Sequence, residues 1–280
     1  EIEITGYNGS SAEITIPSKI GDEDVKAIGG NAFKNNTTIT SVEIPSTVKT
    51  IKYNAFQGCE ALKSITVPDS VTAIGEYAFD GCSALKTVVI GSGLKKIGRL
   101  IFQNCISLEK VTLGENVTGI NDDSLDAGAF SGCTALSEIV WNDKIETIGD
   151  RAFYGCTALR SLSIPASVIT IGPSAFSGCT GLNNVNLGIN LEKIDANAFN
   201  GCKGIKEITL PDSLKTLEYN AFKDCTSLRT VDLGNGLSAM ENNVFDGCTA
   251  LSEVTFGANF ATIGERAFKD CVALTKINWG

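Results

Sequence analysis

Cysteine thiols are the side chains of this sequence with the plainest capacity for chemistry, and they recur at one position of a repeat. The sequence has ten of them, and each follows a phenylalanine by three residues. An even number of regularly placed cysteines is compatible with a disulfide framework, and thiolates also bind metals. A third interpretation is a column of buried free thiols that pack as small hydrophobic groups. The cysteines are Cys59, Cys82, Cys105, Cys133, Cys156, Cys179, Cys202, Cys225, Cys248 and Cys271.

The spacing of these cysteines favours the free thiols. Neighbouring cysteines are at least 23 residues apart, so no C-x2-C pair is available to hold a metal. In stacked coils, equivalent side chains point the same way about 4.8 Å apart, whereas disulfide Cβ atoms lie about 3.8 Å apart on converging bonds. We therefore expect a ladder of reduced, buried thiols, with no metal and no other cofactor.

Other catalytic chemistry has little support in the sequence. Histidine is absent, which excludes Ser-His-Asp and Cys-His catalysis and removes the commonest metal ligand. Carboxylate pairs could act as general acid and base, but no nucleophile motif or glycine-rich phosphate loop accompanies them. Asp122, Asp123 and Asp126 form a weak calcium candidate, because they lack EF-hand spacing and are more typical of a solvated loop. We predict that the chain is not an enzyme.

The phenylalanines show the period of the repeat that positions the cysteines. Four phenylalanines lie 23 residues apart, and after one gap of 28 residues seven more follow at the same interval. A unit of this length cannot bury its own apolar face, so it must stack on its neighbours in a solenoid. The longer gap indicates a five-residue insertion near residues 121–128. The repeat phenylalanines are Phe33, Phe56, Phe79, Phe102, Phe130, Phe153, Phe176, Phe199, Phe222, Phe245 and Phe268.

Each repeat unit combines a strand, a stop and a turn. The alternation in Ile65-Thr66-Val67 predicts a half-buried strand, and Pro68 ends it. Val71 and Ile74 form a second apolar pair, and we expect a short helical turn around the Ala-Phe that follows. Only Gly, Asn or Asp occurs two residues after each repeat phenylalanine. We therefore predict a left-handed backbone, with φ above zero, at these eleven positions.

The repeat divides the chain into two predicted parts. Residues 1–32 carry alternating segments on both sides of Asn8-Gly9, so we predict an N-terminal capping hairpin and an incomplete first coil. Residues 33–280 hold about eleven 23-residue units, with parallel strands on one face and the Ala-Phe turns on the other. The chain starts within a strand-like run and stops directly after a strand. We therefore expect signal and anchor segments to lie outside it, and the uncapped C-terminal end to contact another molecule.

Charge and hydropathy narrow the possible partners. The net charge is −9 and the isoelectric point is near 4.7, so we do not expect nucleic acid to bind. No apolar run approaches the ~18 residues that span a bilayer. We expect a protein partner.

The columns of the repeat resemble a known family. The pattern L-x-x-I-x-[IVL]-P-x-x-[VL]-x-x-I-G-x-x-A-F-x-G-C, which covers residues 33–280, is similar to the BspA-type leucine-rich repeat of bacterial and protist surface proteins. The resemblance implies a leucine-rich-repeat solenoid, a right-handed superhelix with a parallel β-sheet on the concave face and short strands or helical turns on the convex side. It also implies a secreted or cell-surface protein, with adhesion to host matrix or cell-surface proteins as the associated activity.

The outward side chains of the predicted strands are the candidate ligand-binding residues. They are mostly small and polar, and no aromatic residue occurs among them, although binding hot spots usually contain Trp, Tyr or Arg. The apolar exceptions are Val89 and Val140, so we place the candidate patch around them, close to the insertion. The patch comprises Thr87, Val89, Lys110, Thr112, Glu138, Val140, Ser161 and Ser163. The alternative function is a rigid structural spacer that presents another domain of a longer surface protein.

Overall fold

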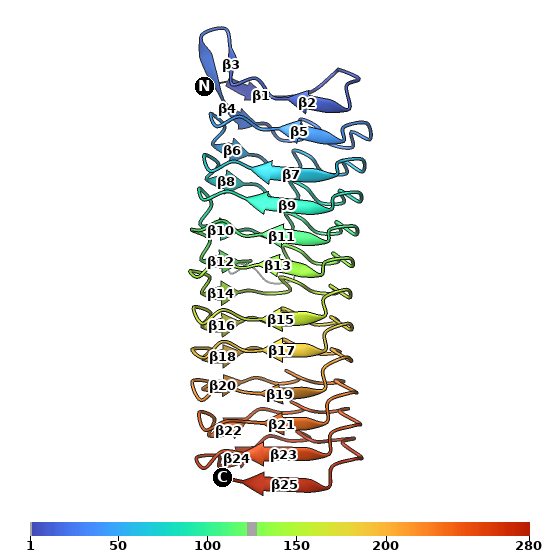
Figure 1. Cartoon of the computed structure of the whole chain (residues 1–280), viewed down its shortest axis with the longest axis vertical. Helices are drawn as coiled ribbons and strands as arrows, with labels where there is room; N and C mark the ends of the chain where they lie inside the picture. The colour runs from blue at the N-terminus through green and yellow to red at the C-terminus, as the bar shows by residue number, and fades with distance from the viewer. Residues whose placement is uncertain (1, 122–127) are drawn as a thin grey trace. The chain divides into compact units, whose positions relative to one another are not determined.

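The computed structural model describes residues 2–121 and 128–280, in two compact units that divide after Lys144. We call residues 1–144 unit 1 and residues 145–280 unit 2. In each unit, one turn of the chain supplies one longer strand and one short strand, most of the short ones two residues long, and the same elements recur from coil to coil (Figure 1). The architecture is a parallel β-solenoid, as the repeat predicts.

The longer strands of unit 1 form one parallel sheet in the order β13-β11-β9-β7-β5-β2. The short strands β4, β6 and β8 pair in parallel with one another, and so do β10 and β12. The longer strands are β2 (Glu13–Thr15), β5 (Ser41–Glu43), β7 (Ser64–Val67), β9 (Thr87–Ile90), β11 (Lys110–Thr112) and β13 (Glu138–Val140). The short-strand side comprises β4 (Glu23–Ile28), β6 (Thr50–Ile51), β8 (Ala73–Ile74), β10 (Lys96–Ile97) and β12 (Gly119–Ile120).

The longer strands of unit 2 fall into two sheets, β15-β17 and β19-β21-β23-β25. On the short-strand side, β14 to β20 pair successively, and β22 pairs with β24. The longer strands are β15 (Ser161–Ser163), β17 (Asn184–Asn186), β19 (Glu207–Thr209), β21 (Thr230–Asp232), β23 (Glu253–Phe256) and β25 (Lys276–Trp279). The short strands are β14 (Thr147–Ile148), β16 (Thr170–Ile171), β18 (Lys193–Ile194), β20 (Thr216–Leu217), β22 (Ala239–Met240) and β24 (Thr262–Ile263).

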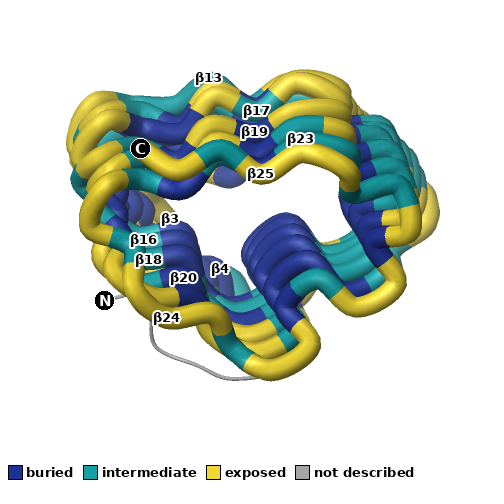
Figure 2. Tube along the Cα trace, turned by 90° about the horizontal axis from the view of Figure 1, so that it is seen from below, coloured by how far each residue is buried: buried dark blue, intermediate teal, exposed yellow. Residues whose placement is uncertain are grey.

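Burial follows the alternation of the sequence. Along β7 and β9, exposed and buried residues alternate, as expected for strands with one face on the core. In each unit, both the strand side and the turn side of the chain carry buried residues (Figure 2). The repeat phenylalanines stack face to face, with ring centroids 5.1 Å apart for Phe56 and Phe79 and 5.1 Å apart for Phe199 and Phe222. The aromatic column therefore supplies a continuous core within each unit.

The turn side differs from the prediction, because no residue in the described ranges is helical. Consecutive tight turns replace the helix: the Gln57 N–H donates to the Asn54 carbonyl three residues earlier, at 3.1 Å. Between these bonds, alternate N–H groups reach the next coil, as when the Phe56 N–H donates to the Ala78 carbonyl at 2.7 Å. The stacked turns thus satisfy their backbone groups between coils rather than along a helix.

Left-handed residues explain why the predicted helical turns are wrong. All eleven positions two residues after a repeat phenylalanine have positive φ, from Asn35 at 58° to Asp270 at 59°, which confirms that prediction. A second left-handed column, which the sequence analysis missed, lies two residues before the phenylalanine and includes Asn54, Tyr77 and Arg266. Two left-handed residues four positions apart interrupt any right-handed helix, so only turns can form between them.

The N-terminal region also departs from the prediction in one respect. β1 (Ile2–Ile4) pairs in parallel with β4, whereas β2 pairs in parallel with β5, so the strands on either side of Asn8-Gly9 do not form a hairpin. The antiparallel pair of this region is β3 (Lys19–Ile20) with the start of β4, joined at Gly21-Asp22. Gly21 has φ of 62°, the conformation that such a tight turn requires. The division into a cap at residues 1–32 and a repeat array at residues 33–280 stays a prediction.

Candidate functional site

The cysteines are buried and free, as the spacing predicts. Thiols of this column can donate to a backbone carbonyl of the preceding coil. The Cys59 Sγ lies 3.1 Å from the Phe33 carbonyl oxygen, and the Cys179 Sγ lies 3.2 Å from that of Phe153. The column therefore satisfies one carbonyl of the stacked turns per coil, a structural role that the sequence analysis did not foresee.

Burial also makes these thiols unreactive. Desolvation raises the pKa of Cys59, Cys179 and Cys271 to about 12 in each case. A thiol with such a pKa holds almost no thiolate at neutral pH, and the thiolate is the form that attacks or binds metal. Among the described residues, no group of three or more His, Cys, Asp or Glu is placed to hold a metal ion. The calcium candidates Asp122, Asp123 and Asp126 lie outside the described residues.

Six of the predicted ligand-binding residues lie together on the longer strands of unit 1. Register pairs Thr87 with Lys110 and Lys110 with Glu138 in one row, and Val89, Thr112 and Val140 follow in the next row. All six are exposed or half-buried. The Lys110 Nζ lies 2.6 Å from the Glu138 carboxylate, so the two charges of this patch neutralise each other.

The other two predicted residues, Ser161 and Ser163, lie on β15 of unit 2. Register pairs them with Asn184 and Asn186 of β17. Both serines are exposed. The predicted patch thus divides between the two units.

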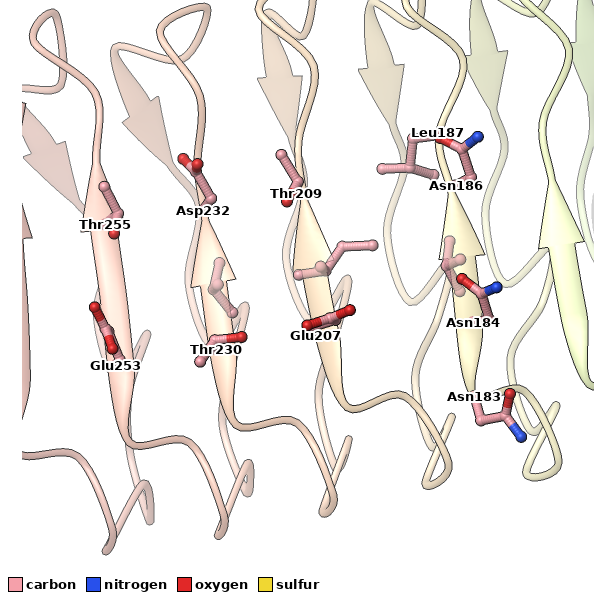
Figure 3. A pocket seen from close by; sticks show the side chains of 13 residues that line it. Asn183, Asn184, Asn186, Leu187, Glu207, Thr209, Thr230, Asp232, Glu253 and Thr255 are labelled. Atoms are coloured by element: carbon pink, nitrogen blue, oxygen red, sulfur yellow. The ribbon is translucent and has the colours of Figure 1, made fainter.

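A hollow of about 390 Å³ lies on the longer strands β17, β19, β21 and β23 of unit 2 (Figure 3). Two rows of side chains line it, one running from Asn184 through Glu207 and the other from Asn186 through Asp232. The Glu207 and Asp232 carboxylates have no cationic partner within the described residues, although Asp232 accepts a hydrogen bond from the Gly234 N–H at 3.0 Å. The rows are Asn184, Glu207, Thr230 and Glu253, and Asn186, Thr209, Asp232 and Thr255.

The hollow lies where the backbone ladder of unit 2 is interrupted. β17 and β19 belong to different sheets, and we call the interval between them the seam and the adjoining cavity the seam hollow. At the next interval, the Arg229 N–H donates to the Lys206 carbonyl at 2.8 Å and the Leu210 N–H to the Asp232 carbonyl at 2.8 Å. In the described part of the chain, the equivalent donors at the seam, Leu187 and Lys206, find no acceptor on the neighbouring strand.

The charged residues at the edges of the seam hollow differ in their partners from those at its centre. Glu253 accepts hydrogen bonds from Lys276 Nζ and Asn278 Nδ2, both at 2.7 Å, and these bonds lower its pKa. Lys206 and Arg229 line an adjoining hollow of about 450 Å³ at the starts of the strands. The unpaired negative charge is therefore concentrated on Glu207 and Asp232.

A further hollow, of about 640 Å³, lies on the short strands β6 and β8 of unit 1 and has largely apolar walls. Tyr53, which is 56% exposed, and Tyr77 line it. Neighbouring charges are paired: the Lys52 Nζ contacts Glu3, and the Arg99 guanidinium donates to both oxygens of Glu76 at 2.8 and 2.9 Å. The second bond makes this pair bidentate.

One signal in the sequence could have located the seam. Three asparagines occur within the four residues 183–186, and asparagine is disfavoured in strands because its side chain competes for backbone partners. The middle residue of β17, Val185, is only half-buried, whereas Ile208 and Val231 at the same position are 2% exposed. The predicted patch was chosen from the apolar residues Val89 and Val140, so the difference at β17 was not predicted.

These features define a leucine-rich-repeat solenoid, with one longer strand per coil and a stacked turn on the opposite side. The sequence matches the model of the BspA type leucine rich repeat region at residues 7–127, 123–199 and 180–280. The chain therefore belongs to the BspA-type leucine-rich-repeat family. No match was found among curated proteins.

Solved structures agree with this assignment. The chain is 30% identical to a leucine-rich repeat protein from Bacteroides ovatus, with a TM-score of 0.64 over 95% of this chain and 78% of the other. It is 28% identical to a leucine rich cell surface protein from Faecalibacterium prausnitzii, with a TM-score of 0.59 over 99% of this chain and 90% of the other. Within the described residues, no helix is long and apolar enough to cross a membrane.

Proposed function

We propose that this chain is the protein-interaction module of a bacterial cell-surface or secreted protein, and that it adheres to host matrix or cell-surface proteins. The observation that carries the proposal is its membership of the BspA-type family, together with similarity to a cell surface protein of Faecalibacterium prausnitzii. Stacked repeats of this class present extended surfaces to protein partners and usually carry no catalytic machinery.

The longer strands supply the surface for this function. Their outward side chains repeat from coil to coil and stay exposed or half-buried, from Ser41 on β5 to Asn278 on β25. Since each coil adds one row of side chains, many weak contacts can accumulate along a single partner. The chain has a net charge of −9, so a partner with a basic surface would also associate faster.

Direct binding tests the proposal. The purified chain would be passed over immobilised fibronectin, fibrinogen and laminin at low and at high salt. We expect saturable binding to at least one of them, weakened by charge reversal on the longer strands. Charge reversal at Lys49, which is exposed and lies outside the longer strands, serves as the matched control.

The absence of binding to all three proteins would contradict adhesion to matrix proteins. It would favour the alternative function, a rigid spacer that presents another domain. The continuous phenylalanine column within each unit suits such a spacer, because it leaves few internal degrees of freedom.

A further inference from the structure

We propose that the seam hollow of unit 2 binds an extended segment of the partner protein through two basic side chains, one on Glu207 and one on Asp232. The inference rests on the proposed function, because it takes the partner to be a protein. It goes further by naming the place, the chemistry of the segment and the residues that recognise it.

Unsatisfied charge is the first argument. Glu207 and Asp232 face the same hollow, and neither has a cationic partner within the described residues. Glu253, which lines the same hollow, is already neutralised by Lys276 at 2.7 Å. Lysine or arginine from a partner is the complement that the two free carboxylates lack.

The interrupted ladder is the second, independent argument. Backbone N–H groups normally find a partner, yet those of Leu187 and Lys206 find no acceptor across the seam. Val185, in the middle of β17, is half-buried, whereas Ile208 at the same position of β19 is buried. Leu187 lines the seam hollow together with Asn184 and Asn186, whereas Lys206 lines the adjoining hollow. The Leu187 N–H and the two asparagine amides can bond the backbone of an extended segment.

The spacing of the carboxylates fits an extended chain. Register places Asp232 beside Thr209, two residues after Glu207 on the neighbouring strand. A strand spacing of about 4.8 Å and a two-residue rise of about 6.6 Å put their Cα atoms about 8 Å apart. On an extended segment, side chains two residues apart project from the same face about 6.6 Å from each other. Lysine side chains at this spacing are long enough for one to reach Glu207 and the other to reach Asp232.

The flanking cations restrict where the basic side chains can lie. Lys206 and Arg229 line the adjoining hollow at the strand starts, so a misplaced lysine would meet like charge there. Four strands cover about 15 Å, the length of about five extended residues. The recognised element is therefore short, with basic residues at alternate positions.

A labelled peptide tests the inference. The probe is a fluorescein-labelled pentapeptide in which lysine alternates with threonine, and the control peptide carries glutamine in place of lysine. Fluorescence anisotropy with the whole chain should show saturable, salt-sensitive binding of the lysine peptide only. The double variant Glu207→Gln, Asp232→Asn should weaken it by about tenfold, the loss expected for two partly exposed ion pairs.

Glu43 provides the matched control. It occupies the same outward position on β5 of unit 1 that Asp232 occupies on β21, and it is exposed. Glu43→Gln removes one carboxylate charge, against two in the seam variant, and should leave peptide binding unchanged. Equal weakening in both variants, or no binding of the lysine peptide to the unmodified chain, would overturn the inference. Circular dichroism of each variant verifies that the solenoid is intact.

The outcome is separable from that of the proposed function. If a matrix protein binds the chain and the seam variant alike, adhesion stands and the seam assignment fails. If the peptide binds at the seam and none of the matrix proteins binds, the seam assignment stands and those matrix proteins are not the partners.

Discussion

The longer strands from β2 to β13 in unit 1 belong to one hydrogen-bonded sheet, whereas those of unit 2 form two sheets that meet at β17 and β19. The short strands on the other side do not separate there, since β18 still pairs with β20. The phenylalanine column also continues past this point, with 5.4 Å between Phe176 and Phe199 and 5.1 Å between Phe199 and Phe222. The backbone pairing on the strand side can therefore be interrupted while the core and the opposite side stay continuous.

The pairing of charged side chains differs between the two units, as does the backbone pairing of their longer strands. In unit 1, the Lys110–Glu138 pair occupies an uninterrupted part of the sheet. In unit 2, Glu207 and Asp232 have no cationic partner among the residues that the structure describes, and they lie where the sheet is interrupted. One fold thus provides a surface whose polar groups bond within the chain and another whose polar groups are available to a partner. Outward columns of similar composition therefore differ in how many of their charges are paired within the chain.

Alkaline pH should produce the largest effect, and it should affect unit 2 more than unit 1. Burial raises the pKa of Cys59 and Cys179 from 9.0 to about 12. The protonated thiol stabilises the fold fully below pH 9, and this contribution is lost as pH rises toward 12, at about 1.4 kcal/mol per thiol per pH unit. Unit 2 holds six buried cysteines and unit 1 holds four.

Chemical unfolding between pH 8 and pH 10.5 measures this loss, and hydrogen exchange assigns it to the two units. Cys179→Ala should reduce the pH dependence of the unfolding free energy by the share of one thiol. A free energy of unfolding that stays constant above pH 9 would show that the thiols titrate alike in the folded and unfolded chain. Equal losses in the two units would contradict the predicted asymmetry.

Truncation of the aromatic column should cost the same in both units. Phe79 and Phe199 are fully buried between two stacked rings, and replacement by Ala should lower the free energy of unfolding by about 3–5 kcal/mol in each case. Urea titration of the two variants gives the comparison, with Phe→Leu at each site as the milder control. A much smaller loss of unfolding free energy at Phe199 would mean that the interruption at the seam extends into the core, so that the core would not be continuous there.

Amide exchange should separate the seam from its neighbour. Within residues 2–121 and 128–280, the Leu187 and Lys206 N–H groups have no acceptor across the seam, whereas those of Leu210 and Arg229 donate across the next interval at 2.8 Å. Loss of one backbone hydrogen bond corresponds to about 1–1.5 kcal/mol of local protection, or about tenfold in exchange rate. Nuclear magnetic resonance resolves the four amides individually. Similar protection at all four would show that the ladder is closed in solution.

Much of the fold followed from the sequence because the repeat displays each position many times. The phenylalanine interval predicted the solenoid, and the residues two positions after it predicted the left-handed backbone, as at Gly58 and Asp224. The helical turn was wrong because the second left-handed column contains Tyr77 and Arg266 besides asparagine, so no residue type identifies it. The place of each side chain within its own coil could be predicted from the repeat. The hydrogen bonds between stacked turns could not, because they depend on the three-dimensional register of neighbouring coils.

The candidate site was harder to predict for a related reason. Periodicity identifies which residues face outward, but not which of them bond to each other. The patch around Val89 and Val140 was chosen because apolar residues interrupt a polar column, yet its charges proved to be paired. The seam depends on whether neighbouring strands close, which the asparagines of β17 influence without deciding alone. Whether either surface binds a ligand stays a prediction.

Single charge removals on the strand surfaces should have the smallest effects, and their signs should differ between the units. Glu138→Gln breaks the ion pair with Lys110. Because the Glu138 side chain is 56% exposed and that of Lys110 is 43% exposed, the change should lower the free energy of unfolding by no more than about 0.5 kcal/mol. Glu207→Gln breaks no ion pair and should leave the free energy of unfolding unchanged or slightly raised. Urea titration of both variants with Lys110→Met as the reciprocal control measures the difference. A larger loss at Glu207 than at Glu138 would mean that Glu207 has an internal partner in solution, and the seam would then lack the free charge on which its proposed ligand depends.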